Sequence, residues 1–355
     1  MRFHKATAAV AAAVIGTTLA ACGGPTGTAN GEVTLRVNTG VPPTHHLVEN
    51  VFEPWQEFVE AETDGAVQVE IYNGDTLGTL KSVLSDLSSG VYDAGVVVPT
   101  YFQDTQLFPL TIGGLAYAYP DIETGNEVMS AYVEKHKEDI SATGVHLVNT
   151  SVSDTYALFS KNPIRTNGDL RGMQVKVQSS SDAMLVEQWG ATPVQLATSE
   201  TYQALERGTV DAVPYTLVGD MGAKFHEVAP YVTKFGAWGT LSTPALSQVF
   251  LDRLPEDLAR QFDQTLLPRL TALNEATYQQ ELEAATEELP ELVDRRGGEV
   301  IEPTGKALDD FRRAARPQWD AWIKQADEKG YDGQALVGDW LRLLEQAGAP
   351  APFKP

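Results

Sequence analysis

Few residues in this chain have the types and spacing that enzymatic chemistry needs. The sequence contains no G-x-S-x-G turn for a nucleophilic serine, no phosphate-binding P-loop and no H-E-x-x-H zinc motif. His45 and His46 are adjacent, but two histidines in a loop are too few for a metal site. Acidic residues at 281–291 fit a solvated helix face better than an acid–base pair. We therefore expect no cofactor and no metal, although carboxylate catalysis leaves little local signal.

The amino terminus indicates where the protein works. Basic residues near the start precede an apolar run at 8–21 that is too short to span a bilayer and is typical of a secretory signal. Small residues before Cys22 resemble the lipobox of bacterial lipoproteins, in which the cysteine carries the lipid; the alternative is a plain signal peptide with an incidental cysteine. We expect a signal peptide at 1–21, lipidation at Cys22, and a Gly/Thr-rich tether at 22–32 on the extracytoplasmic face of the cell membrane.

Charge and length narrow the class of protein. The formal net charge of −22 argues against nucleic acid as a partner, because neutralising phosphates needs clustered Lys and Arg. Cys22 is the only cysteine, so no disulfide can form within the chain. With 355 residues the chain is long enough for two domains of ordinary size.

One pattern occurs twice. A helix that stops at Gly90 is followed by a turn with Asp93 and a short apolar strand, and the same order recurs at Gly208 and Asp211. Glycine suits a helix end because the next residue often adopts a left-handed conformation. The repetition predicts two similar α/β lobes, with a ligand bound beyond the strand ends in the cleft between them. Helix–Gly–strand units also recur in α/β proteins generally, so the pattern alone leaves both interpretations open.

Periodicity places the other elements. Alternating apolar residues predict strands, and apolar residues three or four apart predict helices. Pro268 should kink the longest helical run. The expected strands are 33–37, 67–71, 145–150, 154–160 and 174–178, and the expected helices are 47–62, 77–88, 121–141, 181–189, 254–289, 306–326 and 334–346.

Three segments carry a resemblance to a known family. Residues 169–177, 189–194 and 199–211 resemble, in order and spacing, the solute-binding proteins of tripartite ATP-independent periplasmic (TRAP) transporters. The resemblance implies an α/β, two-lobed periplasmic-binding-protein fold with a hinge, an interlobe cleft and a long bracing helix. We expect the crossings near 151–153 and 240–243. The lobes would comprise 33–152 plus 241–280 (lobe I) and 153–240 plus 281–345 (lobe II).

The same resemblance implies a function. It describes an extracytoplasmic receptor, not an enzyme, that captures a small organic acid and delivers it to the TRAP membrane subunits. A carboxylate is the favoured ligand, because the family mostly transports organic acids. Two alternatives stay open: a secreted lipoprotein hydrolase that uses Asp or Glu, and a ligand sensor for a membrane signalling partner.

Departures from the family pattern select part of the candidate ligand-binding set. Lys176 stands where the family usually has a carboxylate-clamping arginine, and a lysine lacks the planar two-pronged donor of arginine. Tyr215 stands where asparagine is frequent, Tyr156 or its neighbour Thr155 replaces a second basic residue, and Thr198 replaces an aromatic residue. These replacements predict a pocket that is less anion-specific and more aromatic than usual.

Further candidates follow from position alone. Thr44 and His45 lie in a loop after the first strand, and Tyr101 follows the strand of the first repeated unit. Trp238 lies between two glycines near the expected return crossing. An aromatic side chain in a cleft can cover the apolar face of a ligand, although ordinary core packing is its more frequent role.

Overall fold

The structure is a computed structural model. It describes residues 33–41, 43, 45, 47–74, 76–140, 144–196 and 198–353. The predictions on the signal peptide, the tether, Cys22 and Thr44 lie outside these ranges.

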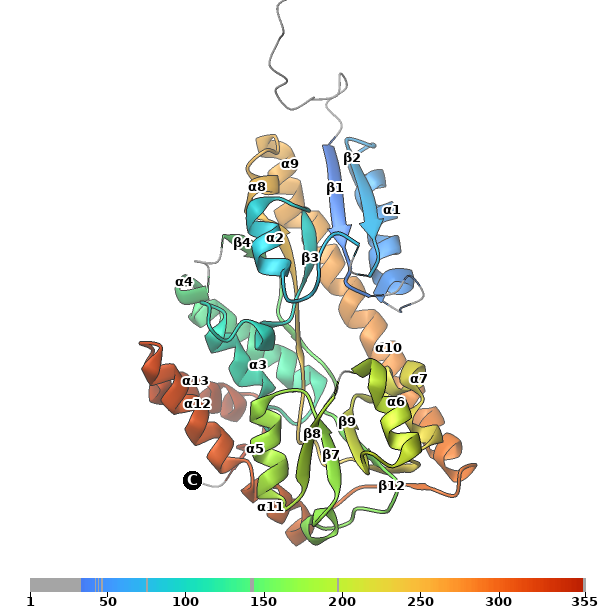
Figure 1. Cartoon of the computed structure of the whole chain (residues 1–355). Coiled ribbons are helices and arrows are strands. Elements are labelled where there is room, and N and C mark those ends of the chain that lie inside the picture. Colours follow the sequence, from blue (N-terminus) through green and yellow to red (C-terminus); the bar gives the residue numbers. More distant parts are fainter. Residues whose placement is uncertain are drawn as a thin grey trace, which may run out of the picture.

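Two six-stranded sheets organise the molecule, one in the upper and one in the lower part of Figure 1. The first has the order β2-β1-β3-β11-β4, with β5 paired to β11. The second has the order β12-β10-β6-β9-β7-β8. The first contains β1 (Val33–Asn38), β2 (Val67–Tyr72), β3 (Ala94–Val97), β4 (Val145–Leu147), β5 (Ser151–Val152) and β11 (Leu241–Ser247), and the second contains β6 (Ala157–Ser160), β7 (Gln174–Val177), β8 (Thr192–Gln195), β9 (Ala212–Tyr215), β10 (Tyr231–Thr233) and β12 (Glu299–Ile301).

The two sheets share a four-stranded arrangement. In the first, β1 pairs in parallel with β2 and β3, and β11 runs antiparallel to β3. In the second, β7 pairs in parallel with β8 and β9, and β6 runs antiparallel to β9. Since β6 and β11 are the strands next to the crossings, each lobe receives its antiparallel strand from a segment that has just left the other lobe. The predicted two-lobed α/β architecture is confirmed.

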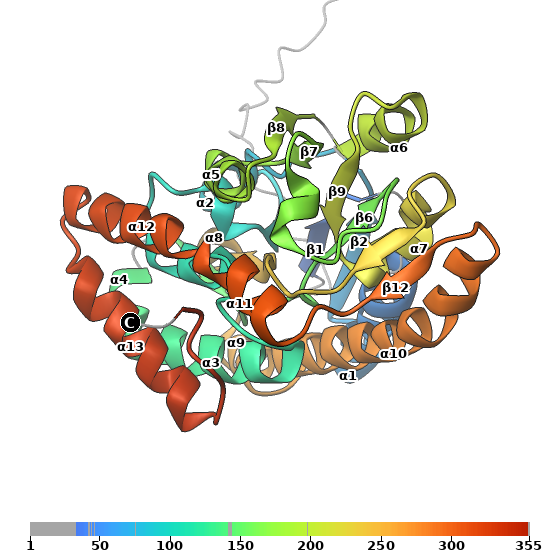
Figure 2. The same ribbon diagram turned by 90° about the horizontal axis from the view of Figure 1, so that it is seen from below.

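The helices follow the expected order with shifted ends. They pack around the sheets, with α12 and α13 on the side opposite to α7 in Figure 2. The helical segments are η1 (Val48–Phe52), α1 (Glu53–Glu62), α2 (Val83–Ser89), η2 (Pro99–Tyr101), η3 (Phe108–Gly114), α3 (Ile122–Lys135), α4 (Lys137–Ile140), η5 (Asn167–Leu170), α5 (Ser180–Gln188), α6 (Thr198–Arg207), α7 (Leu217–Ala223), η6 (Phe225–Glu227), α8 (Gln248–Leu251), α9 (Glu256–Gln261), η7 (Phe262–Leu266), α10 (Leu267–Asp294), α11 (Gly305–Arg313), α12 (Arg316–Glu328) and α13 (Gly333–Gln346).

The repeated unit has a structural reason in each lobe. Gly90 and Gly208 end their helices with φ of 72° and 75°, a conformation that favours glycine. The Oδ2 atom of Asp93 accepts the backbone N–H of Arg36 at 2.9 Å, and Oδ2 of Asp211 accepts the N–H of Gln174 at 2.8 Å. Each aspartate therefore fixes the turn to the neighbouring parallel strand, β1 or β7.

Two crossing segments lie side by side between the lobes. Strand β5 pairs with the start of β11: Val152 lies opposite Leu241, and Ser151 lies opposite Ser242. Beyond this pair, the N–H of Ser153 donates to the carbonyl of Thr240 at 3.0 Å, and the N–H of Tyr156 donates to the carbonyl of Trp238 at 2.8 Å. The chain thus passes from one sheet to the other between β5 and β6 and returns between β10 and β11.

Helix α10 forms a third connection. It packs against η1 and α1 at one end and against α7 and β12 at the other, and it runs diagonally from the upper to the lower lobe in Figure 1. The predicted bracing helix is confirmed. Pro268 lies in the first turn of α10, directly after the π-helical turn Phe262–Leu266. A proline ring clashes with the carbonyl four residues earlier, which explains why regular α-helix is interrupted there.

Several helix predictions were wrong in their limits; the helix expected at 121–141, for example, is interrupted at His136, between α3 and α4. The helix expected at 77–88 begins only at Val83, because Thr79 and Ser82 form a turn in which the N–H of Thr79 donates to the Ser82 hydroxyl at 3.0 Å. The helix expected at 306–326 is two helices, α11 and α12, separated by two alanines. The break has a local cause in Pro317, in the first turn of α12, because its ring clashes with the carbonyl four residues earlier, at Arg313, the last residue of α11.

Tryptophans in the carboxy-terminal helices fix the segment after η3. The indole N–H groups of Trp319 and Trp340 donate to the carbonyls of Ala116 and Ala118, each at 2.9 Å. Trp322 donates to the hydroxyl of Thr111 at 2.9 Å. Buried indole N–H groups need such partners, and these three hold one wall of the interlobe space in place.

Candidate functional site

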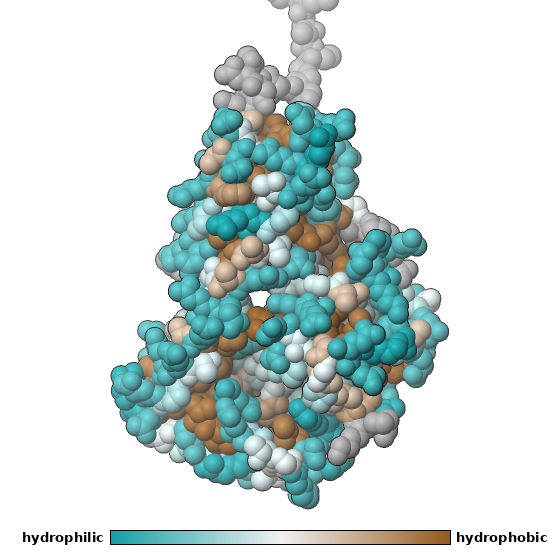
Figure 3. Space-filling model, turned by 180° about the vertical axis from the view of Figure 1, so that it is seen from behind, coloured by the Kyte–Doolittle hydropathy of each residue, from teal (hydrophilic) through white to brown (hydrophobic). Residues whose placement is uncertain are grey.

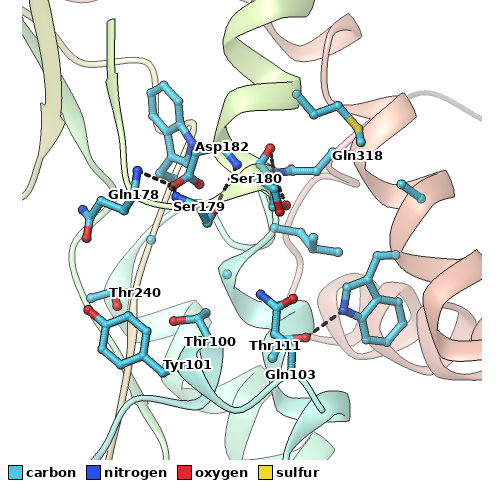
Figure 4. A pocket seen from close by; sticks show the side chains of 18 of the residues that line it. Thr100, Tyr101, Gln103, Thr111, Gln178, Ser179, Ser180, Asp182, Thr240 and Gln318 are labelled. Carbon is cyan, nitrogen blue, oxygen red and sulfur yellow. Dashed lines mark hydrogen bonds between the residues drawn. The ribbon is translucent and has the colours of Figure 1, made fainter. Parts of the chain in front are cut away.

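A cavity of about 240 Å³ opens between the lobes. Figure 3 shows the surface hollowed between the upper and lower halves, and Figure 4 shows the cavity lining from close by. One wall comes from the segment after β3 and from η3, and the opposite wall from the segment that joins β7 to α5. The crossing segment at 238–240 and helix α12 complete the lining.

The start of α5 forms the most polar part of the lining. The hydroxyl of Ser179 accepts the N–H of Asp182 at 3.1 Å, and Oδ2 of Asp182 accepts the N–H groups of Ser179 at 3.1 Å and Gln178 at 3.3 Å. This capping box starts the helix directly after strand β7. Ser180 and Ser181 also line the cavity. First-turn N–H groups have no acceptor within their helix, so this end is suited to a ligand carboxylate.

Asp182 is the one charged side chain among the residues that line this cavity. It is half-buried. Burial raises the pKa of its carboxyl above the usual range, opposed by hydrogen bonds at Ser179 and by the nearby positive charge of Lys176. Figure 4 places Asp182 and Gln178 on the side opposite to Thr100 and Tyr101.

Lys176 is fully buried in β7 and lies outside the cavity lining. Its Nζ atom has no hydrogen-bond partner within the described part of the chain. Burial lowers its pKa to about 8, and the negative charge of Asp182 partly opposes this shift. The lysine therefore supplies a poorly solvated cation close to the cavity rather than at its surface.

Three of the aromatic residues expected at the site line the cavity: Tyr101, Tyr156 and Trp238. Tyr101 is 49 % exposed, whereas Trp238 is 4 % exposed and packs edge-on against Trp189 at 4.9 Å between ring centroids. Tyr215 lies behind this surface, with its ring 6.3 Å from that of Tyr156. The structure thus brings these three rings together at one cavity, and their roles in ligand binding stay predictions.

The other expected site residues lie elsewhere or are not described. His45 does not line the cavity; its Nδ1 accepts the N–H of Leu47 at 3.2 Å. Thr198 begins α6, but its side chain, like Thr44 and Cys22, is outside the described part. Roles in ligand binding for these residues stay predictions.

Several lining residues were missed from the sequence. Gln318 on α12 donates to the hydroxyl of Ser181 at 2.8 Å and accepts the N–H of Ala116 at 2.7 Å, so it ties α5 to the opposite wall. No local signal marks Gln318 or its neighbour on the helix, Trp322. The Ser-x-x-Asp pattern at 179–182 was readable as a helix start, but not as part of a site.

The lining offers hydroxyl, amide and aromatic groups, which suit reversible binding. No group of three or more metal-ligating side chains was found in the ranges that the structure describes. No described helix combines the length and apolar character that a membrane span requires.

Family comparison assigns the class of protein. Residues 37–325 match the family model described as "Bacterial extracellular solute-binding protein, family 7", and the chain belongs to this family. It is 25 % identical over 331 residues to a solute-binding protein of Sulfitobacter sp. (strain NAS-14.1), covering 91 % of this chain and 95 % of that one. It is also 25 % identical over 206 residues to the C4-dicarboxylate-binding periplasmic protein DctP of Rhodobacter capsulatus, covering 58 % and 62 % of the two chains.

Solved structures agree on the fold. A TRAP periplasmic solute-binding protein from Desulfovibrio salexigens, in an open complex, superposes with a TM-score of 0.77 at 23 % identity and covers 90 % of this chain and 98 % of its own. One from Rhodoferax ferrireducens with copurified benzoate gives 0.77 at 19 % identity, covering 89 % and 98 %. One from Sulfurospirillum deleyianum with bound succinate gives 0.74 at 19 % identity, covering 88 % and 99 %.

Proposed function

We propose that this protein is the extracytoplasmic receptor of a TRAP transporter, which captures a small organic acid between its lobes and delivers it to the membrane subunits. The observation that carries the proposal is the cavity between the lobes, where the first turn of α5 and a group of aromatic rings meet at the crossing segments. Relatives of this fold hold benzoate and succinate, which supports a carboxylate as the ligand.

Each wall has a role in this mechanism. The ligand carboxylate accepts hydrogen bonds from first-turn N–H groups at Ser180 and Ser181, in the field of Lys176. Tyr101, Tyr156 and Trp238 cover its apolar part. Ligand contacts to both walls stabilise a closed state, because a ligand shifts an equilibrium only by binding one state better than the other.

A thermal-shift screen of organic acids, sugars and neutral osmolytes tests this function. A compound that binds only the folded state raises the apparent stability, by about 2.7 kcal/mol at a hundred times its Kd. We expect organic acids among the hits. A screen in which sugars alone stabilise the protein would contradict the carboxylate, and turnover of a hit would indicate the hydrolase alternative.

Closure is tested by small-angle scattering. We propose that lobe I (33–152 and 241–280) and lobe II (153–240 and 281–345) move about the crossings at 151–153 and 240–243. Hinge closure around a ligand makes the particle more compact. A saturating hit from the screen that leaves the radius of gyration unchanged would remove the hinge.

We also propose that Cys22 carries the lipid anchor and that residues 22–32 form the tether. Cys22→Ala should release the protein from the membrane fraction or leave it unprocessed, because the variant lacks the residue that would carry the lipid. Stable anchoring takes more than one acyl chain, and without Cys22 none would be attached. Unchanged membrane fractionation of the variant would contradict the anchor.

A further inference from the structure

The charges around the cavity do not match those of a site built for a dianion. Among the described residues that line it, no lysine, arginine or histidine is present, and Asp182 is the one charged group. Lys176 lies beneath, close enough for the two groups to influence each other's titration. The formal charges of Lys176 and Asp182 sum to zero, so the site favours a ligand whose own charges also sum to zero.

Asp182 retains capacity to bind a ligand. Both backbone N–H groups, from Gln178 and Ser179, donate to Oδ2. The second oxygen, Oδ1, can still accept a hydrogen bond from a ligand. A carboxylate that faces the cavity repels anions, and its best partner is a cationic donor such as an ammonium group.

The aromatic lining supports the same ligand chemistry. Trp238 and Tyr156 line the cavity together with Asp182. Figure 4 shows the Asp182 carboxylate and the capping residue Ser179 at the same wall of the cavity. The faces of tryptophan and tyrosine rings attract cations, most strongly where water is excluded.

From these features, and on the basis of the proposed receptor function, we propose that the ligand is a zwitterion. Its carboxylate binds the first turn of α5 at Ser180 and Ser181, and its ammonium group binds Oδ1 of Asp182. Because these three residues are consecutive, the two charged groups of the ligand must lie close together, as in an α-amino acid.

A matched series of probes tests the proposal by calorimetry. Phenylglycine, mandelate and phenylacetate share one skeleton and carry an ammonium, a hydroxyl or a hydrogen beside the carboxylate. We expect the native protein to bind phenylglycine at least tenfold more tightly than mandelate or phenylacetate. Asp182→Asn should abolish that preference and strengthen binding of phenylacetate, because the amide keeps an acceptor for the two N–H groups but removes the charge.

The control variant is Asp332→Asn. Asp332 also accepts a backbone N–H at a helix start, as the N-cap residue of α13 bound to the N–H of Ala335 at 2.9 Å, but it lies outside the cavity. Its substitution should leave all three affinities unchanged. Thermal melting of both variants separates loss of binding from loss of fold, and the ranking of probes on the native protein needs no variant.

Four results would overturn the proposal. Tighter binding of phenylacetate or mandelate to the native protein would remove the zwitterion and leave an organic-acid receptor. Equal effects of Asp182→Asn on all probes would remove the assignment of Asp182, and an effect of the Asp332 control on the ranking would remove its specificity. Binding of none of the three would exclude this ligand class here, while the wider thermal-shift screen judges the receptor function separately.

Discussion

Asp154 in the first crossing segment should make stability depend on pH in a way that one substitution removes. The carboxyl is 5 % exposed. Its Oδ1 accepts the hydroxyl of Tyr278 on α10 at 2.6 Å, and its Oδ2 accepts the N–H of Leu217 at the start of α7 at 2.8 Å. Asp154 therefore joins a crossing segment to two helices.

The expected magnitude follows from the pKa of Asp154. Burial raises this pKa from 3.8 to about 6, and the two hydrogen bonds only partly oppose the shift. The folded state then holds the proton more tightly than the unfolded chain does. The contribution of this group to stability is highest below about pH 4 and falls as the pH rises to about 6, by about 3 kcal/mol in total.

Asp154→Asn removes the titration but keeps the contacts. The amide oxygen can accept the Leu217 N–H, and the amide NH₂ can donate to the Tyr278 hydroxyl. Urea unfolding of the ligand-free protein at pH 4, 5, 6 and 8 measures the difference between the two proteins, in which the other titrating groups cancel. We expect equal stability near pH 4 and a variant more stable by up to about 3 kcal/mol at pH 8.

Tyr278→Phe should act in the opposite direction. It removes a donor to the ionised carboxylate, which costs about 1.5–3 kcal/mol at pH 8 and less at pH 4, where the carboxyl is protonated. If the difference in unfolding free energy between the native protein and Asp154→Asn were the same at every pH, the reasoning would be refuted, because Asp154 would then be ionised with an ordinary pKa.

Three further predictions concern the crossing, the buried lysine and the repeated unit. Gly239→Ala should lower stability and ligand affinity, because the new Cβ would clash with the hydroxyl of Tyr119. Gly222→Ala in α7 meets nothing within 4 Å and should stabilise the protein by up to about 1 kcal/mol, so thermal melts of the two variants should shift in opposite directions. Lys176→Met should weaken a carboxylate-bearing ligand severalfold by calorimetry, less than loss of a direct charge-assisted hydrogen bond would, because Lys176 lies outside the cavity lining; native affinity alone should fall as the pH rises through about 8. Asp93→Ala should cost more stability in urea than Asp211→Ala, because Asp93 is 0 % exposed and paired with two arginines; equal costs would contradict this.

Features that depend on neighbouring residues could be predicted from the sequence. Gly90 and Gly208 end helices because of their backbone freedom, and each aspartate three residues later fixes its turn to a nearby strand. Helix α10 followed from a long run of helix formers, and its irregular start from Pro268. All of these are short-range effects, so periodicity and residue type were sufficient.

Features that depend on distant segments could not be predicted in this way. Gln318 and Trp322 line the cavity because α12 packs beside α5 and η3. These contacts join segments far apart in the sequence: Gln318 and Ser181, which share a hydrogen bond, are 137 residues apart. The same holds for Tyr215, which lies one residue beyond the lining residue Pro214 and behind the cavity surface. A one-residue step along a strand moves a side chain to the other face of the sheet. A resemblance to a family pattern therefore does not establish on which face of the strand Tyr215 lies.

Lys176 and Asp182 show why ligand chemistry needs the structure. In sequence, a lysine in place of a clamping arginine suggested a contact with the ligand, and no prediction was made for Asp182. In the fold, the lysine is buried and the aspartate faces the cavity, so the charge nearest the ligand is negative. The cap explains why an acidic residue is tolerated there, because two backbone N–H groups stabilise its ionised form. One residue then starts the helix and selects the charge of the ligand, and Asp182→Asn separates these two roles because it preserves the first and removes the second.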